Sequence, residues 1–259
     1  MRTLFSFCVC VSMSIDDVAS QSLYPGIVGK DDRVRLTQEG SPWDAIGHVN
    51  IGGFRRRGIC TGTLVAPNLV LTAAHCVVDP WKREPYRLER IHFVAGVSGE
   101  KYKAHAKAKC LRFPPGYKYW PLAGRRSSTS SRRQGLQAFL KDAVVIVLKD
   151  RLSIAPVPLQ KSARPRIGLR LLHASYPADR RYALSAHLDC HLMRADPNGR
   201  LWLVDCDTHF ASSGGPIFVS EGKVLKLAAI MVGSANSGLN VAVPTAIWKS
   251  LAHSDDCPK

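Results

Sequence analysis

The sequence lacks an apolar run of the roughly 18 residues that a membrane-spanning helix needs. It also lacks a Gly-rich phosphate loop, a dinucleotide fingerprint, an internal repeat and long stretches of helical periodicity. These absences exclude a polytopic membrane protein and a solenoid, and they give no support to a nucleotide-dependent enzyme. No cofactor and no metal are predicted.

Acidic residues are scarce, with 20 Asp and Glu against 36 Lys and Arg, so the formal net charge is +16. Apolar residues make up 46% and charged residues 22% of 259 residues, which excludes collagen-like and wholly disordered chains. The simplest interpretation of the charge is a solvated surface that aids solubility, with weak, non-specific binding of anions as a by-product. The alternative is a basic protein whose function is to bind anionic polymers or surfaces.

The first 20 residues resemble a secretory signal rather than part of the fold. Arg2 precedes an apolar stretch over residues 4–15, and the small residues 18–20 suit a signal peptidase, so cleavage is predicted after Ser20. A buried N-terminal helix or strand is the alternative. Export predicts a secreted or periplasmic protein without a membrane span, in which six cysteines remain for three disulfides. These are Cys60, Cys76, Cys110, Cys190, Cys206 and Cys257.

The rest of the chain reads as many short strands, which predicts an all-β sandwich or barrel. The predicted strands cover residues 45–51, 59–65, 69–72, 91–95, 143–148, 169–174, 183–193, 201–204, 216–219, 225–232 and 239–243. A short C-terminal helix is expected to begin at Thr245 as its cap and to carry Ile247, Trp248 and Leu251 on one face.

Two stretches are interpreted as loops, and a third as a linker. Residues 52–58 are predicted to form an exposed hairpin tip. Residues 101–133 are predicted to form a long loop, with ten basic residues and no acidic one, and the segment 124–135 is rich in Ser and Arg. The proline-bearing segment 155–165 suits a linker, so the mature chain is divided into an N-terminal domain, 21–152, and a C-terminal domain, 153–259.

Three places carry the residue types of nucleophilic catalysis. His75 follows a predicted strand and lies between two cysteines that can staple its turn; a packed structural histidine is the alternative. Ser213 is followed by two glycines, which leave backbone amides free to stabilise an oxyanion, although an ordinary Ser/Gly turn has the same residues. Asp142 precedes an apolar strand, from which its carboxylate can orient an imidazole. The Gly-x-Ser-x-Gly elbow is excluded because position 211 is Ala.

The order His75, Asp142, Ser213, with Ala-Ala-His-Cys at 73–76 and Ser-Gly-Gly-Pro at 213–216, resembles the chymotrypsin/trypsin-like serine proteases. Pro-Trp-x-Ala-Ile-Gly at 42–47 and Asp-Cys-Asp-Thr at 205–208 narrow the likeness to the bacterial branch related to the glutamyl endopeptidases. The resemblance covers about residues 27–252. It implies two packed six-stranded antiparallel Greek-key barrels, and a monomer that cleaves polypeptides.

The resemblance also implies roles for individual residues. Ser213 would attack the scissile carbonyl, His75 would transfer the proton, and Asp142 would hold the imidazole. The backbone amides of Ala211 and Ser213 would form the oxyanion hole. The family usually has Gly in place of Ala211, so the amide there is expected to point inward only at the cost of strain. Since Gly26 precedes Ile27-Val28-Gly29 and Ser212 replaces an aspartate, no trypsin-type activation switch is expected.

Substrate contacts are predicted from Asp207, Thr208 and Gly233. Asp207 lies six residues before Ser213, where trypsin carries the carboxylate that selects Arg or Lys. Thr208 matches a residue common in glutamyl endopeptidases. Those enzymes also need a histidine in the strand that lines the specificity pocket, and residues 227–233 contain no histidine. Cleavage after Arg or Lys is therefore favoured over cleavage after Glu.

Disulfides are expected between Cys60 and Cys76, between Cys190 and Cys206 in neighbouring predicted strands, and by elimination between Cys110 and Cys257. A zinc site in His187-x-x-Cys190-His191 is disfavoured because Cys190 points to the other face of its strand. The competing function is a protease-like basic protein whose catalysis has lapsed and which binds anionic polymers or surfaces.

Overall fold

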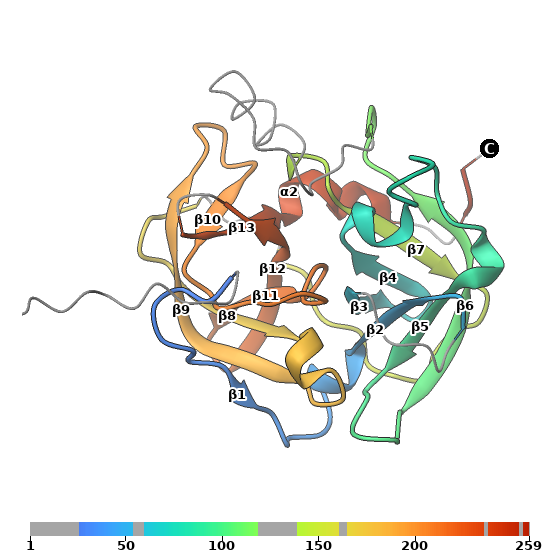
Figure 1. The fold of residues 1–259 in the computed structure, drawn as a ribbon, viewed down its shortest axis with the longest axis horizontal. Helices are drawn as coiled ribbons and strands as arrows, with labels where there is room; N and C mark the ends of the chain where they lie inside the picture. Colours follow the sequence, from blue (N-terminus) through green and yellow to red (C-terminus); the bar gives the residue numbers. More distant parts are fainter. Residues whose placement is uncertain are drawn as a thin grey trace, which may run out of the picture.

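The structure is a computed structural model that describes residues 26–53, 60–118, 139–160, 165–235, 238–253 and 256–258. It is built from two β-barrels that lie side by side (Figure 1). The strands of the first barrel are β2 (Ile46–Ile51), β3 (Cys60–Ala66), β4 (Leu69–Thr72), β5 (Ile91–Ala95), β6 (Ala104–Arg112) and β7 (Val144–Leu148). Those of the second are β8 (Arg170–Ser175), β9 (Ser185–Ala195), β10 (Trp202–Val204), β11 (Pro216–Glu221), β12 (Val224–Ser234) and β13 (Asn240–Pro244).

The two barrels share one strand order although their sequences show no repeat. The first closes in the order β2-β3-β4-β7-β6-β5, and the second runs β8-β9-β10-β13-β12-β11 with β8 also paired to β11. Every pairing within the barrels is antiparallel. The prediction of an all-β fold with two six-stranded barrels is confirmed.

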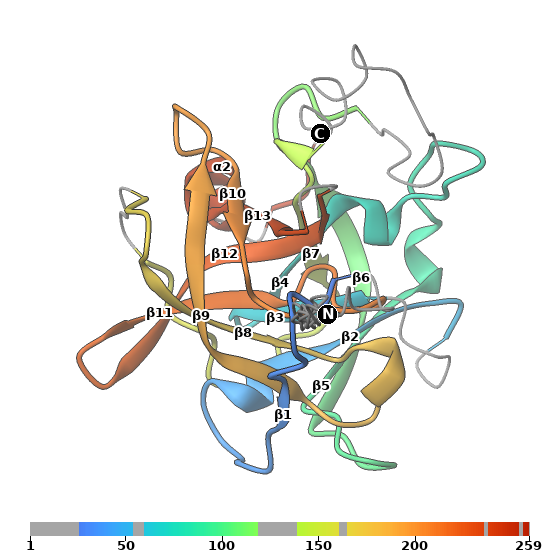
Figure 2. The same cartoon turned by 60° about the vertical axis from the view of Figure 1, so that its left-hand side comes forward.

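Two strands were not predicted from the sequence. The described part of the expected loop at 101–133 contains β6, in which Ala106 and Ala108 are buried while Lys107 and Lys109 are exposed. This alternation escaped detection because alanine is only weakly hydrophobic. The other addition is the two-residue β1 (Val34–Arg35), which runs along the edge of β9 (Figure 2).

The C-terminal helix is present but begins differently from the prediction. It comprises α2 (Thr245–Trp248) followed by a 3₁₀ turn at Lys249–Ala252. Pro244 occupies the N-cap position, without a side-chain hydrogen bond, and Thr245 is the first residue inside the helix, so the expected role of Thr245 as the cap is wrong. Trp248 docks the helix, since its side chain is fully buried in the larger of the two apolar clusters of the protein.

That larger apolar cluster spans both barrels, for Leu64 and Ile146 of the first barrel share it with Phe218 and Val243 of the second. A second cluster, which includes Trp202 and Met231, fills the remainder of the second barrel. Burial of this kind stabilises the fold by about 25 cal/mol per Å² of apolar surface.

Three disulfides link Cys60 with Cys76, Cys110 with Cys257, and Cys190 with Cys206, which confirms the expected pairing. Within the described residues, no helix has the length and apolarity to cross a membrane. The predicted signal at 1–20, residues 54–58 of the predicted hairpin tip at 52–58, and the Ser/Arg-rich segment 124–135 lie outside the described residues.

Candidate active site

Neighbouring strands bring His75 and Asp142 to the same end of the first barrel. Thr72, the last residue of β4, pairs with Val144, the first residue of β7. The chain continues from Thr72 into a 3₁₀ turn, Ala74–Val77, that carries His75, while Asp142 stands two residues before β7. The antiparallel pairing therefore places both side chains at one barrel mouth.

Asp142 holds His75 through two contacts. One carboxylate oxygen accepts the His75 backbone N–H at 2.9 Å, and the other lies 2.7 Å from Nδ1 of the imidazole. A carboxylate only accepts, so Nδ1 carries the proton and Nε2 of the neutral ring is left as a proton acceptor. Burial alone would lower the pKa of His75, but the Asp142 carboxylate more than offsets this and raises that pKa above its usual value. Asp142 is itself only 3% exposed.

Ser213 lies in a loop of the second barrel that is bonded to β3 of the first. The Thr61 N–H donates to the Ser213 carbonyl at 2.8 Å, and the Thr61 hydroxyl donates to the Ala211 carbonyl at 3.0 Å. Cys76 Sγ, beside His75, lies 3.9 Å from the same Ser213 carbonyl. These contacts bring the serine loop to the histidine turn across the barrel interface.

The Ser213 hydroxyl makes no hydrogen bond within the described part of the chain. Catalytic contacts are often long without substrate and tighten when substrate binds. The structure thus joins His75 directly to Asp142, whereas it brings Ser213 to them through the backbone of its loop.

The loop around Ser213 is fixed by close packing at its glycines. A Cβ on Gly214 would lie 2.1 Å from Thr72 Oγ1 and 2.2 Å from the Thr61 carbonyl oxygen, and φ there is +81°. Only glycine fits this place. The loop therefore packs directly against the ends of β3 and β4.

Ala211 adopts a left-handed backbone conformation, with φ of +70°. Among the described residues, neither the Ala211 N–H nor the Ser213 N–H donates to another group of the protein. Both amides are therefore available for an external acceptor. The strain expected from Ala at this position is present in the backbone.

Asp207 is fully buried, and the chain's own N-terminal segment occupies its carboxylate. One oxygen accepts the Val28 N–H and the other the Asp32 N–H, each at 2.8 Å, while the Asp207 N–H donates to His187 Nδ1 at 3.0 Å. A basic substrate side chain could reach this carboxylate only by displacing these amides. Substrate binding by Asp207 stays a prediction.

The other two predicted substrate contacts lie in different places. Thr208 lies beside the N-terminal segment, and Gly233 lies beside the segment that leads to Asp142. The Thr208 N–H donates to the Gly26 carbonyl at 2.8 Å, and the side chain is almost fully buried. Gly233 lies in β12, where an added Cβ would meet the Phe139 ring at 2.8 Å. Phe139 is three residues before Asp142, so Gly233 faces the segment that leads to the carboxylate.

Three groups of side chains within the described ranges have the composition of a metal site. Two of them contain disulfide-bonded cysteines, which have no thiolate to offer. The third joins Asp32, His187 and Asp207, but the Asp207 oxygens and His187 Nδ1 already accept backbone amides. Cys190 of the disfavoured zinc motif is bonded to Cys206.

A family comparison agrees with this geometry, because the trypsin-like peptidase domain matches residues 60–225, which include His75, Asp142 and Ser213. The chain belongs to this family.

Relatives of the trypsin-like peptidase family include the cercarial protease of Schistosoma mansoni, 25% identical over 169 residues that cover 64% of this chain and 60% of the relative. A glutamyl endopeptidase of Bacillus licheniformis is 39% identical over 54 residues, 20% of this chain and 16% of the relative. The chain thus spans less than two thirds of these relatives.

Solved structures share the fold. A Glu endopeptidase in complex with MPD superposes with a TM-score of 0.70 at 18% identity, over 88% of this chain and 99% of that one. The VesB protease of Vibrio cholerae gives a TM-score of 0.62 at 16% identity, over 85% of this chain and 65% of that one. The match to the Bacillus relative agrees with the bacterial branch that the motifs indicated.

Sequence reasoning missed three residues that tie the site together: Thr61, Arg33 and Asp179. Thr61 bonds the serine loop, and Arg33 and Asp179 join the N-terminal segment to the loop before Ala211. The sequence offered one signal, since Asp31-Asp32-Arg33 places opposite charges together just before β1.

Proposed function

We propose that the protein is a serine endopeptidase that hydrolyses peptide bonds through a covalent acyl-enzyme. The observation that carries this proposal is the double contact of Asp142 with His75, at 2.7 and 2.9 Å, at the mouth of the barrel to which the Ser213 loop is bonded. An imidazole held this way has one tautomer, with Nε2 free to take a proton.

In the proposed mechanism, Ser213 Oγ attacks the substrate carbonyl while His75 Nε2 takes its proton. Asp142 stabilises the imidazolium, which then protonates the leaving amine; in deacylation, His75 takes a proton from water, which attacks the acyl carbonyl. The raised pKa of His75 favours the protonated state that this sequence passes through.

The oxyanion would be bound by the N–H groups of Ala211 and Ser213. Their lack of partners within the described residues supports this role. Losing one such donor typically lowers the rate about 10²- to 10³-fold.

Specificity for Arg or Lys is the finer part of the proposal, and the contacts of Asp207 weigh against it. The carboxylate would have to exchange two backbone amides for a substrate cation. Digestion of a peptide library, with the cleavage sites read by mass spectrometry, tests the preference. Cleavage only after Arg or Lys supports it, and cleavage after Glu or apolar residues overturns it.

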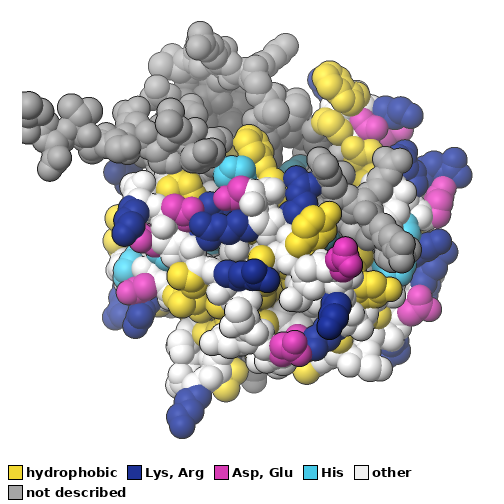
Figure 3. Space-filling model, turned by 60° about the horizontal axis from the view of Figure 1, so that its bottom comes forward, with side chains coloured by type: hydrophobic (Ala, Val, Ile, Leu, Met, Phe, Trp, Pro, Cys, Tyr) yellow, Lys and Arg dark blue, Asp and Glu magenta, His cyan; other side chains and the backbone are white. Residues whose placement is uncertain are grey.

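The proposal includes export to an oxidising compartment, where three disulfides can form, and a monomeric state. The net charge of +16 is interpreted as a solvated surface. On the face that Figure 3 shows, the cationic side chains are scattered among acidic and apolar ones. Weak anion binding remains a by-product of this charge rather than the function.

The test is covalent labelling with a serine-directed fluorophosphonate. We expect the folded protein to be labelled at Ser213, Ser213→Ala to be inert, and Ser220→Ala, an exposed serine on β11, to label like the wild type. Absence of labelling in the folded wild type would overturn the proposal and favour the lapsed, anion-binding protein.

A further inference from the structure

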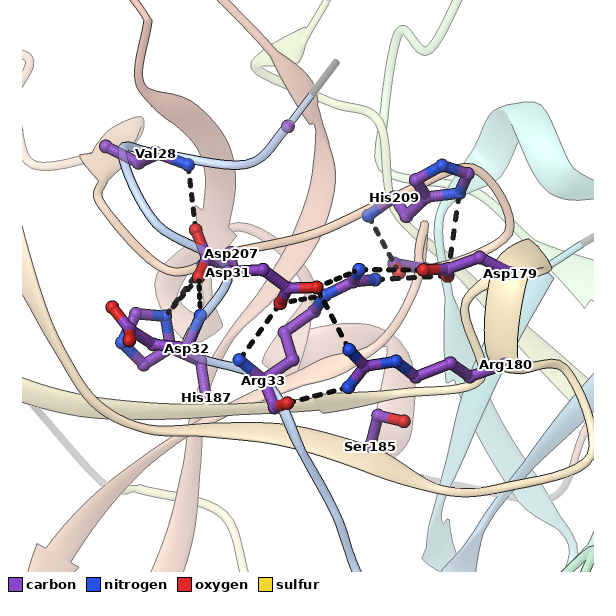
Figure 4. Close-up of polar contacts among 12 residues, drawn as sticks. Val28, Asp31, Asp32, Arg33, Asp179, Arg180, Ser185, His187, Asp207 and His209 are labelled. Atoms are coloured by element: carbon purple, nitrogen blue, oxygen red, sulfur yellow. Dashed lines mark hydrogen bonds and ion pairs between the residues drawn. The ribbon is translucent and has the colours of Figure 1, made fainter. Parts of the chain in front are cut away.

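Arg33 is a buried charge outside the proposed catalytic residues. It is 7% exposed, and its guanidinium lies between two carboxylates from distant parts of the chain (Figure 4). It bonds Asp31 through Nε and Nη2, each at 2.9 Å. It bonds Asp179 through Nη1 at 3.1 Å and Nη2 at 2.8 Å. Both carboxylates are thus held in the bidentate geometry that only a guanidinium provides.

Asp179 lies in a short 3₁₀ turn, Ala178–Arg180, that contacts the loop before Ser213. The Ala178 N–H donates to the Phe210 carbonyl at 2.7 Å, and Asp179 Oδ1 lies 3.7 Å from His209 Nδ1. Phe210 immediately precedes Ala211. The Phe210 carbonyl and the Ala211 N–H belong to one peptide plane, so a bond that fixes the carbonyl also fixes the direction of the amide.

The other side of Arg33 is anchored by the N-terminal segment. Arg180 donates to the Arg33 carbonyl and to Asp31 Oδ2 (Figure 4). Val34, the residue after Arg33, pairs with Ala186 of β9. The N-terminal segment is thus hydrogen-bonded to the second barrel, and Arg33 links this segment with the turn that carries Asp179.

The electrostatics explain why this place needs an arginine. Asp31, Arg33, Asp179 and Arg180 together carry no net charge, so the buried guanidinium is compensated. The hydrogen bond from Arg33 lowers the pKa of Asp31 to about 2. Burial raises the pKa of Asp179, but the hydrogen bonds from Arg33 more than offset it, and that pKa falls below its usual value. A lysine keeps the charge but cannot bond both carboxylates in two places each.

We propose that Arg33 is a positioning residue for the active site: by clamping Asp179, it holds the 178–180 turn against the Phe210 carbonyl and so aims the Ala211 N–H at the oxyanion. This inference rests on the proposed function. The effect is expected in the transition state, because the amide binds the charge that develops there.

The experiment measures fluorophosphonate labelling of Ser213, resolved into the maximal rate of inactivation and the half-saturating concentration. The variants are Arg33→Lys and Asp179→Asn. The matched control is Arg35→Lys, which replaces an exposed arginine of β1, two residues after Arg33. The thermal midpoint of each variant is measured, and labelling is done well below it.

We expect Arg33→Lys and Asp179→Asn to lower the maximal rate about 10- to 100-fold and to leave the half-saturating concentration unchanged, as for a small misplacement of a catalytic group. Arg35→Lys is expected to stay within about twofold of the wild type, as surface changes do. A purely structural role would lower the thermal midpoint without slowing the folded enzyme.

Equal maximal rates for Arg33→Lys and Arg35→Lys, in a wild type that labels normally, would overturn the positioning role and leave the proposed function standing. A wild type that does not label overturns both. If Arg33→Lys does not fold, the maximal rate of Asp179→Asn is compared with that of Arg35→Lys instead, because Asp179→Asn leaves Arg33 paired with Asp31.

Discussion

Ala211 stores backbone strain at the point where the proposed oxyanion donor is formed. Its φ of +70° is a conformation in which a Cβ costs about 1–2 kcal/mol. Strain of this kind persists where the surrounding structure imposes it, here through the bonds of Thr61 and Ala178 to the carbonyls of Ala211 and Phe210.

Ala211→Gly should therefore stabilise the protein by about 1 kcal/mol and keep or raise the labelling rate, since glycine adopts this φ freely. Calorimetry and labelling kinetics measure the two effects. The control is Ala195→Gly at the end of β9, where φ is not positive and a loss of about 0.5–1 kcal/mol is expected. A lower thermal midpoint for Ala211→Gly would contradict the assignment of strain.

The residues of the candidate site were predictable to different degrees. His75, Asp142 and Ser213 stand in local motifs, so their neighbours in sequence were enough to predict the roles proposed for them. The partners of Asp207 could not be predicted, because Val28 and Asp32 are 179 and 175 residues away in sequence and donate through their backbones, which leave no mark in residue type. Arg33 escaped for the related reason that its partner Asp179 lies in a distant loop.

At the scale of the elements, strands were predicted correctly where their apolar side chains are bulky, and one strand was missed where its buried side chains are small. β4 and β5 have the predicted bounds, since Leu, Val, Ile and Phe dominate them. β6 was missed because alanines supply its buried positions. Its pairing with β5 and β7 closes the first barrel, a long-range requirement that outweighs weak local preference.

The Cys60–Cys76 disulfide connects two elements of the proposed site. Cys60 precedes Thr61, whose N–H bonds the Ser213 carbonyl, and Cys76 follows His75. Cys60→Ser/Cys76→Ser should lose about 3 kcal/mol of stability for a loop of this length and should also label more slowly in the folded state.

Cys110→Ser/Cys257→Ser is the matched comparison. Its bond closes a loop of 147 residues, so the loss of stability should be larger, about 5 kcal/mol, with the labelling rate of the folded protein unchanged. Both are measured by urea unfolding and by labelling at a temperature where each variant is folded. Equal labelling by both variants would show that the Cys60–Cys76 bond does not position the site.

At the scale of the whole molecule, the fold was predictable from the number of short strands together with ordered motifs, whereas the joining of the barrels was not. Residues 155–160, expected as a linker, are bonded to both barrels: the Val157 N–H donates to the Leu64 carbonyl, and the Leu227 N–H to the Pro158 carbonyl. Prolines mark an extended path but not its partners. The segment is therefore part of the interface.

Two buried histidines make the stability of the whole molecule depend on pH. His48 of β2 lies edge-on to Tyr176, with Nε2 2.7 Å from the Arg181 carbonyl, and His173 Nδ1 lies 3.1 Å from the Pro216 carbonyl. Burial lowers the pKa of each to about 4. The folded state thus disfavours protonation of both rings.

Each histidine contributes stability that is fully present above its unfolded pKa of about 6.5 and is lost as pH falls toward 4. Between pH 7.5 and pH 5 the expected loss is about 2 kcal/mol per histidine. Asp31, whose pKa is lowered to about 2, loses its contribution only at more acidic pH, so it does not contribute to this change.

Urea unfolding at pH 7.5 and pH 5 tests this with His48→Gln and with His253→Gln, which replaces an exposed histidine. Between pH 7.5 and pH 5, the free energy of unfolding of the His48 variant should fall by about 2 kcal/mol less than that of the wild type, because the variant lacks the His48 titration and keeps every other titrating group. The His253 variant should show the full fall. An unchanged pH dependence in His48→Gln would mean that the pKa of His48 is the same in the folded and unfolded states, so that the contact with the Arg181 carbonyl offsets the effect of burial.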